Sequence, residues 1–313
     1  MTVQENPYRS VAAVERRQSI HHHLAQPYVN LACGSTFVEG DPWINLDYAP
    51  SSVMVQSADL LAPLPFANDS VAVIYSSHFL EHVPRSRVPG LLAECFRVLR
   101  PGGVLRLVMP DLEEMCREYL ARRDAGDHEK ADLVVVEMID QCVRLTGGGE
   151  LGALYRTYSG DPGRYATMMD YLNWRNGENL RPVSTGQAAD RGQAVTAPRP
   201  TRSRPFLERI TTLPSRVRKR AQNAWFAWLL QRLPAAFREQ NVSLASVGER
   251  HHWLWDRHQL TEALRAAGFE HIERCTCDTG RIDGFPFFPL DVDDDGRARK
   301  GAESMYVEAS KPC

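Results

Sequence analysis

Two short apolar runs near the start of the chain limit most strongly what it can fold into. Residues 28–32 (YVNLA) lead into a turn of small residues at 33–35 (CGS), and residues 43–46 (WINL) end on Asp47. Apolar runs of this length, bounded by turn residues, are typical of strands buried in a parallel sheet. We therefore predict two buried strands, the first followed by a turn of small residues and the second by a carboxylate.

The link between these two runs is short. Only nine residues separate Gly34 from Ile44, whereas a parallel crossover normally takes about a dozen or more. The breaker run Gly40-Asp41-Pro42 lies inside the link and favours a loop. We therefore predict that a loop replaces the first crossover helix of an ordinary doubly wound unit.

The turn and the acid together indicate a ligand. Small residues at a turn let backbone N–H groups face a bound group, and an acid at the tip of the next strand can accept hydrogen bonds from a ribose diol. The usual G-x-G-x-x-G pattern is absent, because Ala32, Gly34 and Phe37 stand where its glycines would be. The pattern still predicts a nucleotide-type ligand lying across the two strand ends.

Strands and helices alternate along the rest of the chain. Residues 71–75 (VAVIY) and 104–109 predict buried strands, and residues 87–99 predict an amphipathic helix between them that stops at the sequence RPGG. Towards the carboxyl terminus, residues 259–267 predict a helix, and residues 269–277 and 305–309 predict two more strands. This order predicts an α/β fold with right-handed crossovers.

Composition narrows the function classes. With a net charge of −2, the chain lacks the overall positive charge typical of nucleic-acid-binding proteins, so no nucleic-acid partner is expected. The seven cysteines are scattered and odd in number, which suits a reducing cytosol better than a disulfide framework. We find no apolar signal core and no run of about 20 apolar residues, so we expect a cytoplasmic location.

No metal site is predicted from the sequence. Cys275-x-Cys277 lacks a second ligand pair, and the three consecutive histidines at 21–23 lie in a predicted helix, 11–24, where they point in different directions. The acidic run formed by Asp291 and residues 293–295 lacks a correctly spaced final ligand acid and is interpreted as a solvated loop.

Several motifs together resemble a known family. The pieces LACGS, INLD, ADL with LPF, YSSHFLEHV and RVLRPGGVLRLVMPD follow one another over roughly residues 28–111, and a D-x-x-x-L-x-x-x-L-x-x-A-G-F pattern follows from Asp256. In order and spacing the chain resembles the class I S-adenosylmethionine (SAM)-dependent methyltransferases of the type 11 group. The resemblance implies a Rossmann-like, mostly parallel seven-stranded sheet whose last strand is antiparallel, and SAM as cofactor.

The resemblance also implies site residues. The backbone of Ala32, Cys33 and Gly34 would approach the methionine part of SAM, Asp47 would hold the ribose hydroxyls, and Asp59 and Leu60 would contact adenine. Residues 76–78 (Ser76, Ser77, His78) would lie beneath the sulfonium. The alternatives are structural: a solvated turn acid at 47, a turn or cap residue at 59, and helix caps at Glu81 and His82.

Histidines are the candidate catalytic residues, because a hydroxyl acceptor needs partial deprotonation and a neutral imidazole can provide it. His78 is the first candidate, and His251 and His252 follow, with a structural role as the alternative for these two. Glu81 and Asp111 are weaker candidates, either of which would orient a base or the acceptor. The predicted reaction is O-methylation of a small molecule, natural product or sugar-like acceptor. RNA or a lipid-linked substrate is the alternative acceptor, and a non-catalytic SAM-binding protein is the alternative class.

The long stretch between the matching pieces predicts an insertion. We predict an amino-terminal part of the SAM-binding domain at 1–124, an inserted helical cap at 125–250 with a disordered loop near 183–205, and a carboxyl-terminal part at 251–313. Residues 213–233 combine a basic flank with an aromatic helix, which suits either peripheral membrane contact or a solvated cap helix. The oligomeric state is not predicted.

Overall fold

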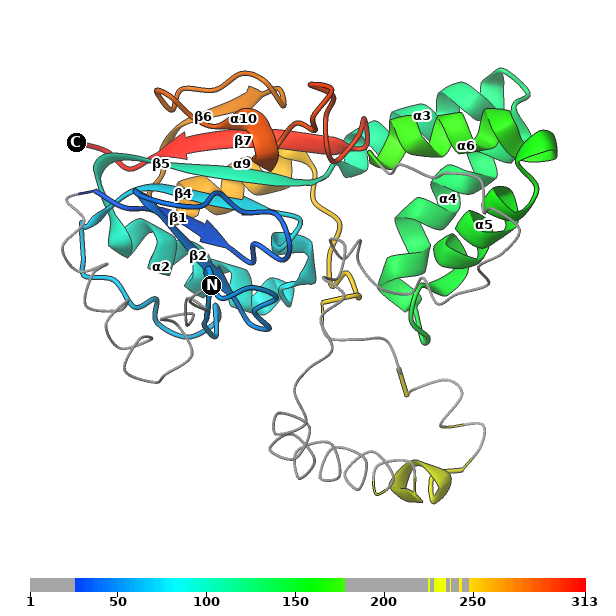
Figure 1. The fold of residues 1–313 in the computed structure, drawn as a ribbon, viewed down its shortest axis with the longest axis horizontal. Coiled ribbons are helices and arrows are strands. Elements are labelled where there is room, and N and C mark those ends of the chain that lie inside the picture. The colour runs from blue at the N-terminus through cyan, green and yellow to red at the C-terminus, as the bar shows by residue number, and fades with distance from the viewer. Residues whose placement is uncertain (1–25, 178–224, 226–227, 235–236, 238–241, 244–247) are drawn as a thin grey trace, which may run out of the picture.

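The computed structural model describes residues 26–177, 225, 228–234, 237, 242–243 and 248–313. Within them, seven strands form one sheet in the order β3-β2-β1-β4-β5-β7-β6 (Figure 1). The strands span β1 Tyr28–Leu31, β2 Trp43–Asp47, β3 Val55–Ser57, β4 Val71–Ser77, β5 Leu99–Pro110, β6 Glu270–Cys275 and β7 Ser304–Ser310. Strands β1 to β5 pair in parallel, and β7 is antiparallel to both β5 and β6. The predicted Rossmann-like sheet with an antiparallel last strand is confirmed.

The strand order reverses beside β1. Strands β2 and β3 lie on one side of β1 and β4 and β5 on the other, so successive connections leave the centre in opposite directions. Ligands of open α/β sheets bind outside the carboxyl ends of the strands at such a switch point. Leu31 pairs with both Leu46 and Ser76, so the residues that follow β1, β2 and β4 meet at this edge.

Helices α2 and α9 cover one face of the sheet. Helix α2 (Val88–Val98) connects β4 to β5 and follows two short 3-10 helices, η1 (Leu80–His82) and η2 (Arg85–Arg87). Helix α9 (Arg257–Ala266) begins at Asp256, whose Oδ1 accepts from the Gln259 N–H at 2.7 Å. Both helices bury an apolar stripe against the strands in the main core. Their bounds agree with the predicted helices at 87–99 and 259–267 within two residues.

A long loop with the short helix α10 (Phe287–Leu290) covers the other face. Here the interpretation of the acidic run as a solvated loop is wrong for Asp291, which is 1% exposed. Its carboxylate accepts from Arg106 Nε at 2.8 Å and from the Tyr75 hydroxyl at 2.7 Å. An ion pair with the buried Arg106 of β5 therefore holds Asp291 against this face of the sheet.

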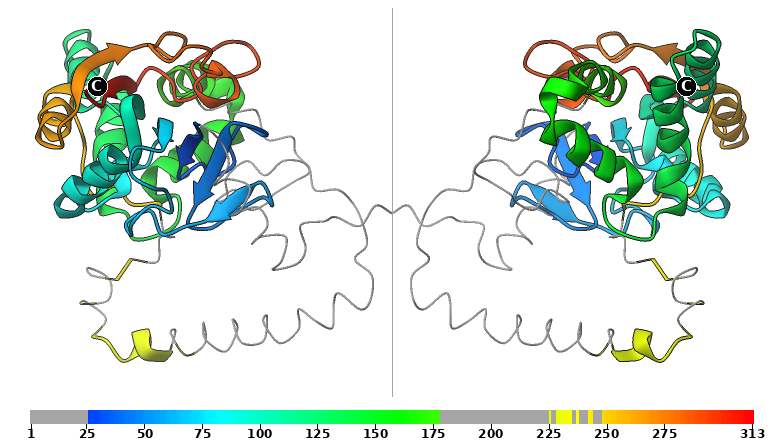
Figure 2. Two further views of the ribbon diagram at one scale, coloured as in Figure 1. Left: turned by 90° about the vertical axis from the view of Figure 1, so that its left-hand side faces the viewer. Right: turned by 90° about the vertical axis from the view of Figure 1, so that its right-hand side faces the viewer.

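Four helices form a separate body, α3 (Leu112–Asp124), α4 (His128–Val143), α5 (Gly149–Gly160) and α6 (Pro162–Asn176). They enclose their own core, in which Tyr158 and Tyr171 are buried. Figure 1 places the body beyond the carboxyl end of β5, and the end-on views of Figure 2 show it behind the sheet in one and in front in the other. Helices α5 and α6 lie within the predicted helical insertion, but the sequence did not predict them individually.

Helix α3 packs on α4, and its Glu114 pairs with Arg175 of α6 at 2.6 Å. The domain boundaries at 124 and 250 and a capping role for the helices stay predictions. The predicted helix 11–24, the loop 183–205 and most of 213–233 lie outside the described residues.

Candidate functional site

The turn after β1 is built from backbone in a left-handed conformation. Ala32 has φ 54° and Gly34 has φ 56°, while the Cys33 N–H donates to the Leu46 carbonyl at 3.2 Å. A β-carbon added to Gly34 would meet no atom within 4 Å, so the outer side of the turn is open. The left-handed conformation costs an alanine about 1–2 kcal/mol. No helix joins β1 to β2 in this described stretch, which confirms the predicted loop.

Burial makes the Cys33 side chain a poor nucleophile. Cys33 is 7% exposed, and burial, aided by the Asp47 carboxylate, raises the pKa of the thiol to about 12. The thiol therefore stays protonated at neutral pH. Cys33 can therefore contact a ligand at the turn only through its backbone.

Asp47 lies at the end of β2 and holds the turn. Its Oδ2 accepts from the Gly34 N–H at 2.9 Å and its Oδ1 from the Ala49 N–H at 2.8 Å. Each carboxylate oxygen has a second lone pair, and the side chain is half-buried, so it can still accept from a ligand. The structure thus brings Asp47 and Gly34 together at the switch point, as the sequence predicted.

Asp59 and Leu60 follow β3 at the same edge of the sheet. The Ala58 N–H donates to the Asp47 carbonyl at 2.9 Å, which places this segment beside β2. Asp59 is exposed, and its Oδ1 accepts from the Leu61 N–H at 3.0 Å. The Leu60 side chain is buried in the core. Of this pair, only Asp59 presents a polar side chain to solvent.

Ser76 and Ser77 end β4. The Ser76 hydroxyl is buried and donates to the Leu31 carbonyl at 3.1 Å, which ties the carboxyl ends of β4 and β1 together. Ser77 pairs with Val108 of β5. Ser76 therefore has a structural role in shaping the floor of the switch point.

His78 leaves β4 in a left-handed conformation, φ 50°, and its ring is held at both nitrogens. Nε2 lies 2.9 Å from the Ser304 hydroxyl oxygen, and Nδ1 lies 3.4 Å from Glu81 Oε1. The Ser304 hydroxyl donates to the Lys300 carbonyl at 3.0 Å, so Nε2 is the donor to Ser304 and Nδ1 keeps its lone pair. Burial, aided by Lys300, lowers the pKa of His78 well below its usual value, so the ring is neutral at pH 7.

Glu81 is the most unusual residue of the site. It lies in η1 and is 1% exposed, and neither carboxylate oxygen accepts a hydrogen bond from the described residues. Burial raises the pKa of this carboxyl to about 8, although the positive charge of Lys300 acts in the opposite direction. No side-chain cap bond is made at η1, so the capping interpretation of Glu81 is wrong.

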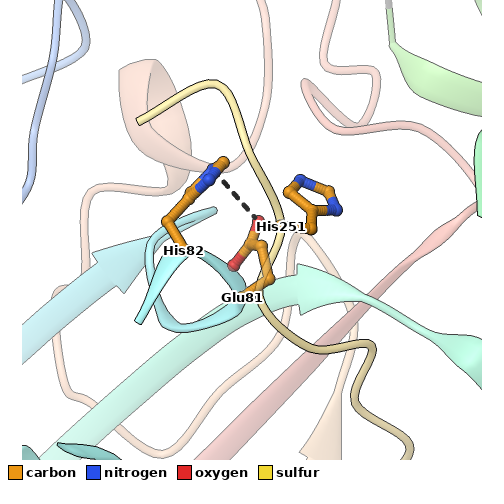
Figure 3. A group of neighbouring side chains, drawn as sticks. All are labelled: Glu81, His82 and His251. Carbon is orange, nitrogen blue, oxygen red and sulfur yellow. Dashed lines mark ion pairs between the residues drawn. The ribbon is translucent and has the colours of Figure 1, made fainter. Parts of the chain in front are cut away.

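His82 and His251 lie against Glu81 (Figure 3). His82 Nδ1 donates to the Arg250 carbonyl at 2.9 Å, which leaves the lone pair on Nε2, 4.0 Å from Glu81 Oε1. The His251 ring is 4.8 Å from the His82 ring, and its buried Nδ1 has no partner in the described chain. Burial, with His82 and Arg144, lowers the pKa of His251 to about 3.

Two of the three predicted catalytic histidines lie in the cluster around Glu81, and the third does not. His78 and His251 belong to one cluster, because both lie against Glu81 and the charge of His251 acts on His78. The side chain of His252 is exposed, and only its backbone contributes, by donating to the Glu81 carbonyl at 2.7 Å. Sequence reasoning made Glu81 a weaker candidate for orienting a base or the acceptor and assigned no chemistry to His82. The spacing His78-x-x-Glu81-His82 nevertheless brings an acid and two imidazoles close together in the sequence, a combination found in some zinc enzymes.

Comparisons with known proteins agree with this architecture. Residues 39–107 match the family model of a methyltransferase domain. No curated protein matches the sequence. In the part of the chain that the structure describes, none of the helices has the length and apolar character needed to cross a membrane.

Solved structures give distant likenesses. A SAM-dependent methyltransferase from Archaeoglobus fulgidus is 12% identical, with 96% of this chain and 95% of that chain covered and a TM-score of 0.36. One from Mesorhizobium loti is 15% identical, with 98% and 100% covered and a TM-score of 0.34. A possible exported protein from Bordetella parapertussis is 12% identical, with 97% and 71% covered and a TM-score of 0.34. The assignment of the fold stands on the strand order itself.

Proposed function

We propose that the chain is a class I SAM-dependent methyltransferase that methylates a hydroxyl group of a small molecule, natural product or sugar-like acceptor. The match of residues 39–107 to a methyltransferase domain and the strand order of the sheet support the class and the cofactor. The observation that supports a hydroxyl acceptor is the neutral His78 ring at the carboxyl end of β4, which keeps a lone pair on Nδ1 on the side of Glu81. A cytoplasmic location and the absence of a nucleic-acid partner are part of the same proposal.

The residues at the switch point fit SAM. The open side of Gly34 leaves room for the methionine part against the backbone, and the spare lone pairs of Asp47 suit the ribose hydroxyls. The exposed Asp59 lies beyond Asp47 on the adenine side. When bound, SAM supplies a methyl group on a positively charged sulfur. Positioning of the acceptor supplies most of the acceleration, because the leaving group is already good.

The histidine cluster suits a hydroxyl acceptor. A hydroxyl becomes a better nucleophile when a neutral base takes its proton. His78 is neutral, keeps its lone pair on Nδ1 and is oriented through Ser304. In this proposal His78 is the base, and His251 helps to bind the acceptor.

Calorimetric titration with SAM and with its demethylated product tests the cofactor site. We expect Asp47→Ala to weaken binding by about 10- to 100-fold, since a hydrogen bond to a charged group contributes about 1.5–3 kcal/mol. Asp283→Ala, which removes an exposed acid on a distant loop, is the control and should bind like the wild type. Absence of SAM binding to the wild type contradicts the proposal.

Transfer of a labelled methyl group to a panel of hydroxyl compounds tests the reaction. We expect a labelled ether product whose formation falls in His78→Gln while SAM binding is retained. Binding of SAM with label found only on nitrogen or carbon acceptors contradicts O-methylation. Binding without any transfer favours the non-catalytic alternative.

A lipid-linked acceptor is the second candidate. In the described part of residues 213–233, Trp225 is 55% exposed, Trp228 is 50% exposed and Leu229 is 37% exposed, and Arg232 lies 4.3 Å from the Trp228 ring centroid. Exposed aromatic rings beside basic side chains suit the interface of an anionic membrane. Co-sedimentation with anionic liposomes should fall in a Trp228→Ser variant, and equal sedimentation of variant and wild type speaks against this candidate.

A further inference from the structure

Three potential metal ligands converge in the cluster beside the switch point. One ligand atom from each of Glu81, His82 and His251 lies within 4.8 Å of the others (Figure 3). The first two come from η1, directly after β4, and the third comes from the segment that leads into α9. The fold therefore brings together residues that are far apart in the sequence.

Two of these side chains are buried without hydrogen-bond partners. Glu81 is 1% exposed and His251 is 6% exposed. Both Glu81 oxygens and His251 Nδ1 lack hydrogen bonds within the described residues. Buried polar atoms are nearly always paired, so unpaired atoms gathered in one small cluster indicate a ligand that satisfies them together.

The third side chain has the orientation of a metal ligand. His82 donates its Nδ1 hydrogen to the Arg250 carbonyl and directs its Nε2 lone pair towards Glu81. Histidines that bind metals nearly always donate their other ring N–H to a carbonyl or carboxylate in this way. The backbone acceptor thus selects the tautomer that binding requires.

Main-chain hydrogen bonds hold the two segments in place. The His252 and Trp253 N–H groups both donate to the Glu81 carbonyl, at 2.7 and 3.3 Å, and the His251 N–H donates to the Gln141 carbonyl of α4 at 3.0 Å. The ligand atoms lie within 4.8 Å of one another, whereas tetrahedral zinc holds its ligand atoms about 3.3 Å apart, so binding of the ion brings these side chains closer together.

The donor set selects the kind of ion. One carboxylate and two imidazoles suit zinc or another first-row transition metal, whereas Mg²⁺ and Ca²⁺ prefer oxygen ligands alone. Lys300 and Arg144 are the positive groups whose charges act on the cluster, and they oppose a cation. The ionised Glu81 carboxylate must therefore supply the compensating negative charge.

We infer that Glu81, His82 and His251 form a binding site for a divalent transition-metal ion, with zinc as the best match. Three protein ligands leave at least one coordination position open. If the proposed function holds, the open coordination position would take the oxygen of the acceptor hydroxyl beside His78; this part of the inference rests on the proposed function. Binding of the ion itself does not depend on the reaction.

Titration of the metal-stripped full-length protein with Zn²⁺ against a chromophoric chelator tests the site. All proteins in the comparison carry His21→Ala, His22→Ala and His23→Ala, so that no imidazole of this histidine run contributes to the titration. We expect about one ion per chain, and we expect Glu81→Gln and His251→Asn each to weaken binding by about tenfold or more. The matched control is His252→Asn, which alters the adjacent exposed histidine and should leave binding unchanged.

Substitution with Co²⁺ gives a second readout. Nitrogen and oxygen ligands in a four-coordinate site produce visible absorption bands without a sulfur charge-transfer band. A sulfur band would place the ion at cysteine and overturn the inference, as would absence of binding or equal binding by Glu81→Gln and His251→Asn. Circular dichroism confirms that each variant is folded.

Titration of the same metal-free proteins with SAM separates this inference from the proposed function. Retained SAM binding without zinc binding overturns only the metal site. Zinc binding without SAM binding supports the metal site and overturns the proposed function.

Discussion

The structure contains two buried charged clusters that differ in whether their polar atoms are paired. Around Arg106, which is 0% exposed, every guanidinium nitrogen has a partner. Nε donates to Asp291 at 2.8 Å, Nη1 to Glu308 at 2.7 Å, and Nη2 to the Thr276 carbonyl at 2.8 Å. Around Glu81, by contrast, both carboxylate oxygens lack hydrogen bonds in the described chain.

This difference separates an architectural role from a binding role. The Arg106 cluster joins β5, β7 and the loop that covers them, so folding alone explains why its charges are buried. The Glu81 carboxylate makes no comparable link, because main-chain hydrogen bonds and the His82–Arg250 bond already join the segments around it. A buried acid that the fold does not need is best explained by something that binds to it.

The largest expected effect follows from breaking the paired cluster. Arg106→Met leaves Asp291 and Glu308 buried without their cation, and removal of one partner from a buried ion pair typically destabilises a protein by about 3–5 kcal/mol. We expect a loss of this size in the free energy of unfolding, measured by urea denaturation.

Arg265→Met is the matched control for Arg106→Met. The Arg265–Glu262 pair is exposed on both sides, at 65% and 56%, and surface pairs contribute about 0–1 kcal/mol. A cost for Arg106→Met no larger than that of the control would mean that the paired cluster does not support the fold.

Glu81→Gln should raise the free energy of unfolding of the metal-free protein, whereas Arg106→Met lowers it. Burial raises the pKa of Glu81 from 4.5 to about 8. The folded state therefore holds this proton more tightly than the unfolded state, and its contribution is fully present below pH 4.5 and is lost as the pH rises to 8. Glutamine is neutral throughout, so the variant should match the wild type at pH 4 and exceed it by about 1–3 kcal/mol at pH 8.

Urea unfolding across this pH range measures that divergence. The charged or titratable groups whose charges act on the cluster are His78, His82, His251, His252, Arg144 and Lys300, and all of them stay unchanged in the variant. Parallel pH profiles for the two proteins, or a less stable variant at pH 8, would show that Glu81 is paired in solution and would remove the contrast between the clusters.

Local sequence patterns were enough to predict most of the fold. The apolar run at 71–75, the amphipathic stretch at 87–99 and the short link between Gly34 and Ile44 each depend on neighbouring residues, and each prediction agrees with the structure. Asp47 was predicted at the switch point for the same reason, because parallel strands deliver their carboxyl ends to one edge.

Pairings between distant residues could not be predicted in this way. Nothing near Asp291 distinguishes it from the solvated acids that follow, since its partner Arg106 lies in another strand. Likewise, Glu81 resembles a cap at the start of a helix until the segment containing His251 is placed against it. Helices α5 and α6 were missed because their apolar residues face a core of their own.

Backbone strain is a second difference between the candidate site and the paired Arg106 cluster. Ala32 at the turn and His78 beside Glu81 adopt positive φ, at 54° and 50°, whereas Arg106 and its two acidic partners do not. Ala32→Gly relieves about 1–2 kcal/mol of strain, while the added freedom of the unfolded chain costs about 0.4–1 kcal/mol. We expect a net stabilisation of about 0.5 kcal/mol by urea denaturation.

Ala121→Gly gives the reference for an unstrained alanine. Ala121 is exposed in α3, where glycine costs about 0.8–1 kcal/mol. If Ala32→Gly raises the free energy of unfolding and Ala121→Gly lowers it, the turn holds Ala32 in a strained conformation. Such strain is expected where the backbone lies against a ligand. An equal cost at both positions would mean that the turn is relaxed in solution, and the contrast between architecture and site would then rest on the unpaired atoms around Glu81 alone.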